Sequence, residues 1–203
     1  MRKKKNVACF GLGRDQYPFV KEMSKDFIIH GFDINRNCYA KKLVDYFYNT
    51  PYSKKDKILY LLKKKNISQI LSFATEAPIN LIGYLNTKLK IKGNKYSVTS
   101  KISNKLKYRK ILKRFKLKQP PFYEKLNKDI IKKKIITKPK YGSGSENIFF
   151  VKNIESLSKH NYFEEFIENG EMFALDGFCI KRKFIPIALS KKNKYKDNVF
   201  IDK

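Results

Sequence analysis

The chain has 203 residues, and its 46 Lys and Arg side chains outnumber its 18 Asp and Glu, which gives a formal net charge of +28. Its content of hydrophobic residues, 42%, is enough to build a core and excludes a wholly disordered chain. No apolar stretch reaches the roughly 18 residues of a transmembrane helix, and three cysteines without short spacing make neither a disulfide framework nor a zinc site, as expected of a cytoplasmic protein.

The first half of the sequence alternates apolar runs with helical patterns. Asn6–Phe10 is largely apolar and leads into Gly-Leu-Gly, as expected of a buried strand followed by a turn. In chain order we predict a strand at 6–10, a helix at 17–25, a strand at 27–32, a short helix at 40–47, a helix after a capping box at 53–56, a strand at 67–73 and a helix from Pro78. This alternation, with its short connections, predicts a parallel sheet with helices on its faces.

The second half has a different pattern, so we place a domain boundary after residue 100. It begins with a basic helix, predicted over 103–115, which a Gln-Pro-Pro segment ends. We then predict strands at 135–138, 147–151 and 162–167, a short helix at 154–159, and a pair of strands at 172–180 and 184–189.

One loop combines a lysine with small residues. Lys138 closes a predicted strand and is followed by Pro-Lys-Tyr-Gly-Ser-Gly-Ser. Small residues let backbone N–H groups approach phosphate oxygens, and a lysine beside them supplies a point charge. The loop lacks the pattern of a Walker A motif. An ordinary hairpin loop has the same composition, so the loop alone favours neither interpretation.

Two further segments, one acidic and one basic, carry charged residues at spacings that could serve a nucleotide. Glu164 and Glu165 are adjacent on a predicted strand, and Glu171 follows seven residues after the first. Backbone groups at a strand end can hold an adenine, and a later carboxylate can reach ribose hydroxyls. Lys105 and Arg109 lie one turn apart on the predicted basic helix. The alternatives are an acidic strand edge and a solvated basic helix.

The first turn of the sequence resembles part of a dinucleotide fingerprint. Gly11 and Gly13 follow the first strand, and Asp33 comes about twenty residues later. The third glycine of that fingerprint is missing, because its place is taken by Gln16. We therefore predict the strand-to-helix turn of a Rossmann-like sheet rather than a site for NAD.

In this order and spacing, the basic helix, the lysine loop and the acidic strand resemble the ATP-grasp superfamily, above all its carbamoyl-phosphate-synthase-like and biotin-carboxylase-like carboxylate ligases. The resemblance implies an α/β fold, with a Rossmann-like pre-ATP-grasp domain and its parallel sheet over 1–100, and an incomplete α+β ATP-grasp domain over 101–203. It also implies ATP as the ligand. The residues that it assigns to phosphate are Lys105, Lys138 and the loop of Gly142, Ser143, Gly144 and Ser145, those that it assigns to adenine are the backbone of Glu164, Glu165 and Ile167, and the ribose falls to Glu171.

The resemblance also implies parts that this sequence does not contain. The family pattern continues with acidic residues that hold Mg²⁺, whereas residues 191–203 offer only Asp197 and Asp202. We therefore expect an amino-terminal portion of a ligase that acts through an acyl phosphate, that binds ATP weakly and that is inactive alone, with no assigned catalytic residue, metal ligand or carboxylate. An incomplete sheet predicts a complementing chain, as in a split ligase, or a homo-oligomer.

The positive charge leaves one alternative, a basic nucleic-acid-binding module. Only six of the 46 basic residues are Arg, the residue best suited to read bases and phosphates. Lys, Asn and Ile are all frequent, which is typical of an A/T-rich genome. We expect weak polyanion binding that salt removes.

Overall fold

The computed structural model describes residues 4–142, 147–151, 161–168, 170–181 and 183–192. The chain divides into two compact units, Met1–Tyr108 and Arg109–Lys203. The division falls within helix α5 (Lys105–Arg114), eight residues past the boundary that the sequence pattern indicates. Each unit has sheets of its own.

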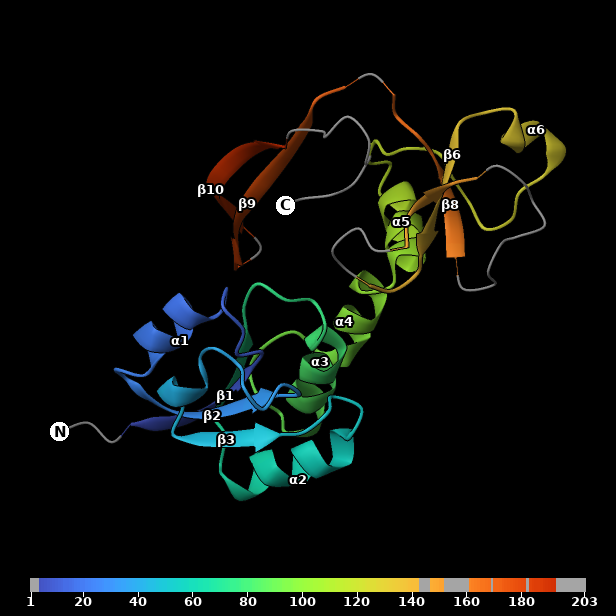
Figure 1. The fold of residues 1–203 in the computed structure, drawn as a ribbon. Coiled ribbons are helices and arrows are strands. Elements are labelled where there is room, and N and C mark those ends of the chain that lie inside the picture. The colour runs from blue at the N-terminus through green and yellow to red at the C-terminus, as the bar shows by residue number, and fades with distance from the viewer. Residues whose placement is uncertain (1–3, 143–146, 152–160, 169, 182, 193–203) are drawn as a thin grey trace. The chain divides into compact units, whose positions relative to one another are not determined.

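The first unit is built on a parallel sheet of four strands in the order β3-β2-β1-β4 (Figure 1). The strands are β1 (Lys5–Phe10), β2 (Phe27–Asp33), β3 (Tyr46–Asn49) and β4 (Gln69–Ser72). The helices are α1 (Tyr17–Met23), the 3₁₀ helix η1 (Lys41–Leu43), α2 (Lys55–Lys64), α3 (Ile79–Lys88) and α4 (Tyr96–Ile102). The predicted parallel sheet is thus confirmed.

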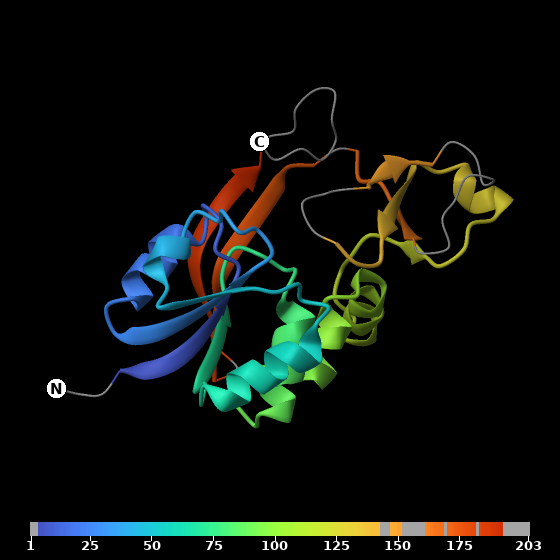
Figure 2. The same cartoon turned by 60° about the horizontal axis from the view of Figure 1, so that its bottom comes forward.

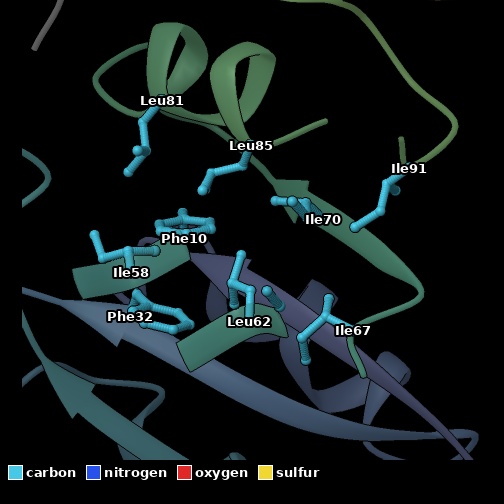
Figure 3. Close-up of a cluster of buried hydrophobic side chains, with 10 residues drawn as sticks. Phe10, Phe32, Ile58, Leu62, Ile67, Ile70, Leu81, Leu85 and Ile91 are labelled. Atoms are coloured by element: carbon cyan, nitrogen blue, oxygen red, sulfur yellow. The ribbon is translucent and has the colours of Figure 1, made fainter. Parts of the chain in front are cut away.

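The core of this unit lies on both faces of the sheet. Along β1, Ala8 and Phe10 pack into one apolar cluster, whereas Val7 and Cys9 pack into the other. Helices α2 and α3 cover the first cluster, which Figure 3 shows around Phe10. A strand buried on both faces reads as a continuous apolar run, which is why the sequence identifies β1 so readily.

Two predictions for this unit are wrong in detail. Residues 40–47, predicted as a helix, form η1 and the start of β3. Tyr46 and Tyr48 of β3 stack beside His30 of β2, with ring centroids 4.6 and 5.9 Å away, so pairing across the sheet decides the conformation. Helix α2 begins at Lys55 without a side-chain cap, not at the predicted capping box.

The second unit contains an antiparallel sheet in the order β5-β8-β6-β7. Its strands are β5 (Phe122–Tyr123), β6 (Ile135–Pro139), β7 (Phe149–Phe150) and β8 (Asn161–Glu165), and a short helix α6 (Lys128–Ile131) precedes β6. Of the three strands predicted here, the one at 135–138 extends one residue further, the one at 147–151 is confirmed only over 149–150, and the one at 162–167 lies at 161–165. Strand β5 and helix α6 are additions. The helix predicted at 154–159 lies outside the described residues.

A separate hairpin follows, in which β9 (Met172–Ile180) pairs with β10 (Lys183–Lys192), as predicted (Figure 2). Most of its described large apolar side chains are exposed, and so is Cys179. Among the described helices of both units, none is long and apolar enough to cross a membrane.

Candidate functional site

The second unit has a pocket of about 210 Å³ beside the middle strands of its antiparallel sheet. Apolar side chains and charged side chains of both signs share its wall. The lining residues are Arg109, Pro120, Ile136, Lys138, Glu164, Glu165, Phe166, Ile167, Gly170, Glu171 and Met172. The pocket therefore brings together Lys138 and the acidic strand, which the sequence alone places 26 residues apart.

The register of β6 and β8 explains why Lys138 and Glu164 lie close together. In the antiparallel pairing of β6 with β8, Ile136 lies opposite Glu164 and Lys138 lies opposite Tyr162. Side chains two residues apart on a strand share a face, so all four of these side chains lie on the same side of the sheet. A slip of one residue would turn Lys138 and Glu164 to opposite faces.

Glu164 is the centre of a buried cluster of polar groups. Its side chain is 2% exposed, yet it accepts four hydrogen bonds. Arg109 donates from Nε to Oε1 at 2.6 Å and from Nη2 to Oε2 at 3.1 Å. Lys138 Nζ donates to Oε2 at 2.7 Å, and the Tyr162 hydroxyl donates to Oε1 at 2.8 Å. A buried carboxylate is stable only when it is paired in this way.

The cluster keeps its charges at neutral pH. Burial on its own would raise the pKa of Glu164, but the hydrogen bonds from Arg109, Lys138 and Tyr162 outweigh it and lower that pKa. Burial likewise opposes the charge of Arg109, whose pKa is nevertheless raised by its bonds with Glu164. The pKa of the Tyr162 hydroxyl is raised, by burial first and then by the neighbouring Glu164. Glu164 is therefore an anion, and Tyr162 is a neutral donor.

The end of β8, whose residues line the pocket, has backbone groups that the sheet leaves unpaired. Glu165 N–H donates to the Pro121 carbonyl at 3.0 Å, so the backbone of Glu165 faces the β5 side. In an antiparallel sheet such a pair exchanges two hydrogen bonds, but proline has no N–H to return. The Glu165 carbonyl is thus left without its donor in the ladder. In the part of the chain that the structure describes, Ile167 N–H has no hydrogen-bond partner either.

The carboxylates at the end of β8 differ in their surroundings. Glu165 turns its side chain to Tyr123 and Lys133, each at 2.5 Å, and the bond from Lys133 is the main reason why its pKa is lowered. Glu171 is exposed, lines the pocket, and pairs with Lys191 of β10. Of these two acids, Glu171 has the more exposed side chain, 58% against 23%, so a ligand can reach its carboxylate more easily.

The other predicted site residues have separate positions. Lys105 is the first residue of α5, one turn before Arg109, and it is not among the residues that line the pocket. Gly142 has a φ of +123°, which only glycine adopts readily, as predicted for a loop of this kind. Ser143, Gly144 and Ser145 lie outside the described residues.

Sequence reasoning did not identify the partners of Glu164. Arg109 lies on the predicted basic helix without an assigned function, and Tyr162 is only the first residue of a predicted strand. The signal in the sequence is the alternation along the predicted strand, which puts Glu164 on the same face as Tyr162 and Phe166. An acid buried among such residues requires cations from elsewhere in the chain.

The first turn of the chain is arranged as the sequence predicted. Leu12 N–H donates to Asp33 Oδ2 at 2.8 Å, and Asn35 N–H donates to Oδ1 at 2.8 Å. The Gln16 side chain, 7% exposed, donates to the carbonyl oxygens of Phe73 and Ala74. Asp33 and Gln16 therefore tie together the loops that follow β1, β2 and β4.

Across the described ranges, no three His, Cys, Asp or Glu side chains are grouped as ligands of an ion. We therefore assign none of the described site residues to a metal.

Comparison with known proteins identifies the fold. Residues 102–198 match the family model of the ATP-grasp domain, and no curated protein sequence matches the chain. The fold resembles an L-amino acid ligase from Bacillus licheniformis (TM-score 0.74, 18% identity, covering 100% of this chain and 54% of that one). It also resembles N5-carboxyaminoimidazole synthetase from Staphylococcus aureus, solved with ADP (TM-score 0.72, 17% identity, covering 96% of this chain and 57% of that one).

A third similar structure is carboxyaminoimidazole ribonucleotide synthase from Aspergillus clavatus, solved with ATP (TM-score 0.73, 12% identity, covering 95% of this chain and 55% of that one). The chain thus spans a little over half the length of these structures. At such identities the likeness is one of fold. Residues 102–198 belong to the ATP-grasp domain family, and the chain has the fold of an ATP-grasp ligase.

Proposed function

We propose that the second unit binds ATP and serves a ligase that activates a carboxylate. In such a reaction a carboxylate oxygen attacks the γ-phosphorus, ADP leaves, and an amine or thiol then displaces phosphate from the acyl phosphate. The observation that carries the proposal is one pocket in which Lys138 lies near a strand end with open backbone groups. The ADP and ATP in two structures of similar fold support the choice of nucleotide.

The strand end supplies what an adenine needs. Adenine presents an amino donor at N6 and an acceptor at the neighbouring N1. The Glu165 carbonyl is an acceptor without its ladder donor, and the Ile167 N–H is a donor two residues later. The apolar side chains of Ile136, Ile167 and Met172 also line this pocket and can cover the faces of the base. At about 210 Å³ the pocket is smaller than the roughly 300–1,000 Å³ of sites that enclose a whole ligand, so it suits the base better than the whole nucleotide.

The charged residues of the site would serve the ribose and the phosphates. Ribose hydroxyls can donate to the carboxylate of Glu171, which now pairs with Lys191. Lys138 would hold a phosphate with the donors of its ammonium group that Glu164 does not use. We also propose phosphate contacts for Lys105 and for the loop that begins at Gly142.

Calorimetric titration with ATP tests this assignment, with Lys132→Ala as the matched control. Lys132 belongs to the same unit and is 78% exposed, outside the pocket, so its loss removes the same charge without touching the site. At about 0.3 M salt the screening length is below about 10 Å, which suppresses general attraction to polyanions. We expect saturable binding that Lys138→Ala weakens at least tenfold and Lys132→Ala leaves unchanged. A wild-type chain that shows no saturable binding would refute the proposal.

We further propose that this chain does not turn ATP over alone and that a complementing polypeptide or a second copy covers the hairpin. The support is the exposure of its apolar side chains, which reaches 69% for Leu189 and 56% for Phe178. Such a surface favours association. Steady ATP hydrolysis by the isolated 203-residue chain would contradict the first statement.

A further inference from the structure

We propose that Arg109 sets the charge of the nucleotide site. It is a positioning residue that acts through Glu164: by neutralising this buried carboxylate, it leaves the positive charge of Lys138 uncompensated and available to phosphate. The inference rests on the proposed binding of ATP and adds to it the residue on which phosphate recognition depends.

The first step is the geometry of the pair. The planar guanidinium of Arg109 contacts both oxygens of Glu164, at 2.6 and 3.1 Å, and the side chains are 21% and 2% exposed. A fork of this kind fits a carboxylate in a way that lysine cannot reproduce. Because little water reaches the pair, its charges are poorly screened from their neighbours.

The second step is the place of Lys138. Its ammonium lies 2.7 Å from Oε2 of the same carboxylate and is 20% exposed. In a pair made of Lys138 and Glu164 alone, the two charges would cancel. The pocket wall would then have no net positive charge to attract a triphosphate, and the Glu164 carboxylate would repel it. With Arg109 present, two cations share one anion, and the cluster carries a net charge of +1.

The third step separates this idea from a purely structural role. Removal of Arg109 leaves a neutral cluster, whereas removal of both Arg109 and Glu164 leaves Lys138 alone and restores +1. Charge control therefore predicts that a second substitution repairs the first. If Arg109 only supports the fold of the strand end, the loss of two buried partners would harm binding at least as much as the loss of one.

The experiment measures ATP and adenosine affinities by calorimetry for the wild type, Arg109→Gln, Glu164→Gln and the double variant. For Arg109→Gln we expect ATP to bind roughly 10- to 100-fold more weakly, the range of a hydrogen-bonded charge, with adenosine changed less than threefold. The double variant should return to within a few fold of the wild type for ATP. Glu164→Gln should bind ATP no more weakly than the wild type does, because its cluster carries +2.

The controls keep the outcomes distinct. Circular dichroism establishes that each variant is folded, and if Arg109→Gln is not, the double variant and Glu164→Gln still test the charge rule. ATP affinity unchanged in Arg109→Gln, a double variant as weak as Arg109→Gln, or an equal loss for adenosine would overturn the inference. A wild-type chain that does not bind ATP would instead refute the proposed function.

Discussion

The buried pair of Arg109 and Glu164 should also stabilise the second unit. Removing one partner of a fully buried ion pair costs about 3–5 kcal/mol, because the other charge is left uncompensated. Here Arg109 is 21% exposed, and Glu164 keeps its bonds to Lys138 and Tyr162. We therefore expect Arg109→Gln to lower the free energy of unfolding by less, about 2–3 kcal/mol.

Urea denaturation with hydrogen–deuterium exchange of peptides from β6 and β8 measures this loss, because it reports the second unit apart from the first. With a slope of about 1–3 kcal/mol/M, the midpoint should fall by roughly 0.7–3 M. The matched control is Lys133→Gln, which breaks the ion pair with Glu165 at a site where the lysine is 56% exposed. Solvent screens that pair, so we expect no measurable shift. Equal shifts for the two variants would refute the reasoning.

Four other results are expected. Pro121→Ala supplies an N–H that can pair with the Glu165 carbonyl, so calorimetry should show ATP and adenosine binding weakened alike, by roughly 3- to 10-fold for one lost hydrogen bond. Burial first, and the charge of Lys65 second, lower the pKa of His30 in the folded chain. As pH falls below about 6.5 the unfolded imidazole takes up protons before the folded one does, so the first unit should lose stability. Thermal melts of His30→Gln should not show this loss of stability at low pH. Light scattering should show the wild type associating and Leu189→Lys associating less. Fluorescence anisotropy should show oligonucleotide binding at low salt that is lost near 0.3 M, about where general attraction is screened; binding that persists would favour a nucleic-acid-binding module.

Most of the first unit could be predicted from the sequence because its central strands are buried on both faces. The apolar run of β1 identifies itself without knowledge of its neighbours. Residues 46–49 could not be assigned in the same way, since they form a strand by pairing with β2, where Tyr46 and Tyr48 stack beside His30. The local sequence pattern of residues 46–49 carries no information about that contact with β2.

The candidate site likewise has residues that the sequence predicts and a contact that only the fold creates. Lys138, Glu164 and Glu171 were predicted from their order along the chain, and all three line the pocket. The bond between Arg109 and Glu164 joins residues 55 positions apart and depends on the packing of α5 near β8. A sequence motif can identify such residues, but only the folded structure shows which of them form an ion pair.

The placement of the cysteines makes the hairpin accessible to chemistry without mutagenesis. Cys9 and Cys38 lie in the core of the first unit, and burial raises the pKa of both thiols, that of Cys9 to about 12. Thiolate is the reactive form, so both should resist alkylation while the chain is folded. Cys179 is exposed on β9. A maleimide dye should therefore label this one position in the native protein, and its fluorescence would report directly on whatever comes to cover the hairpin.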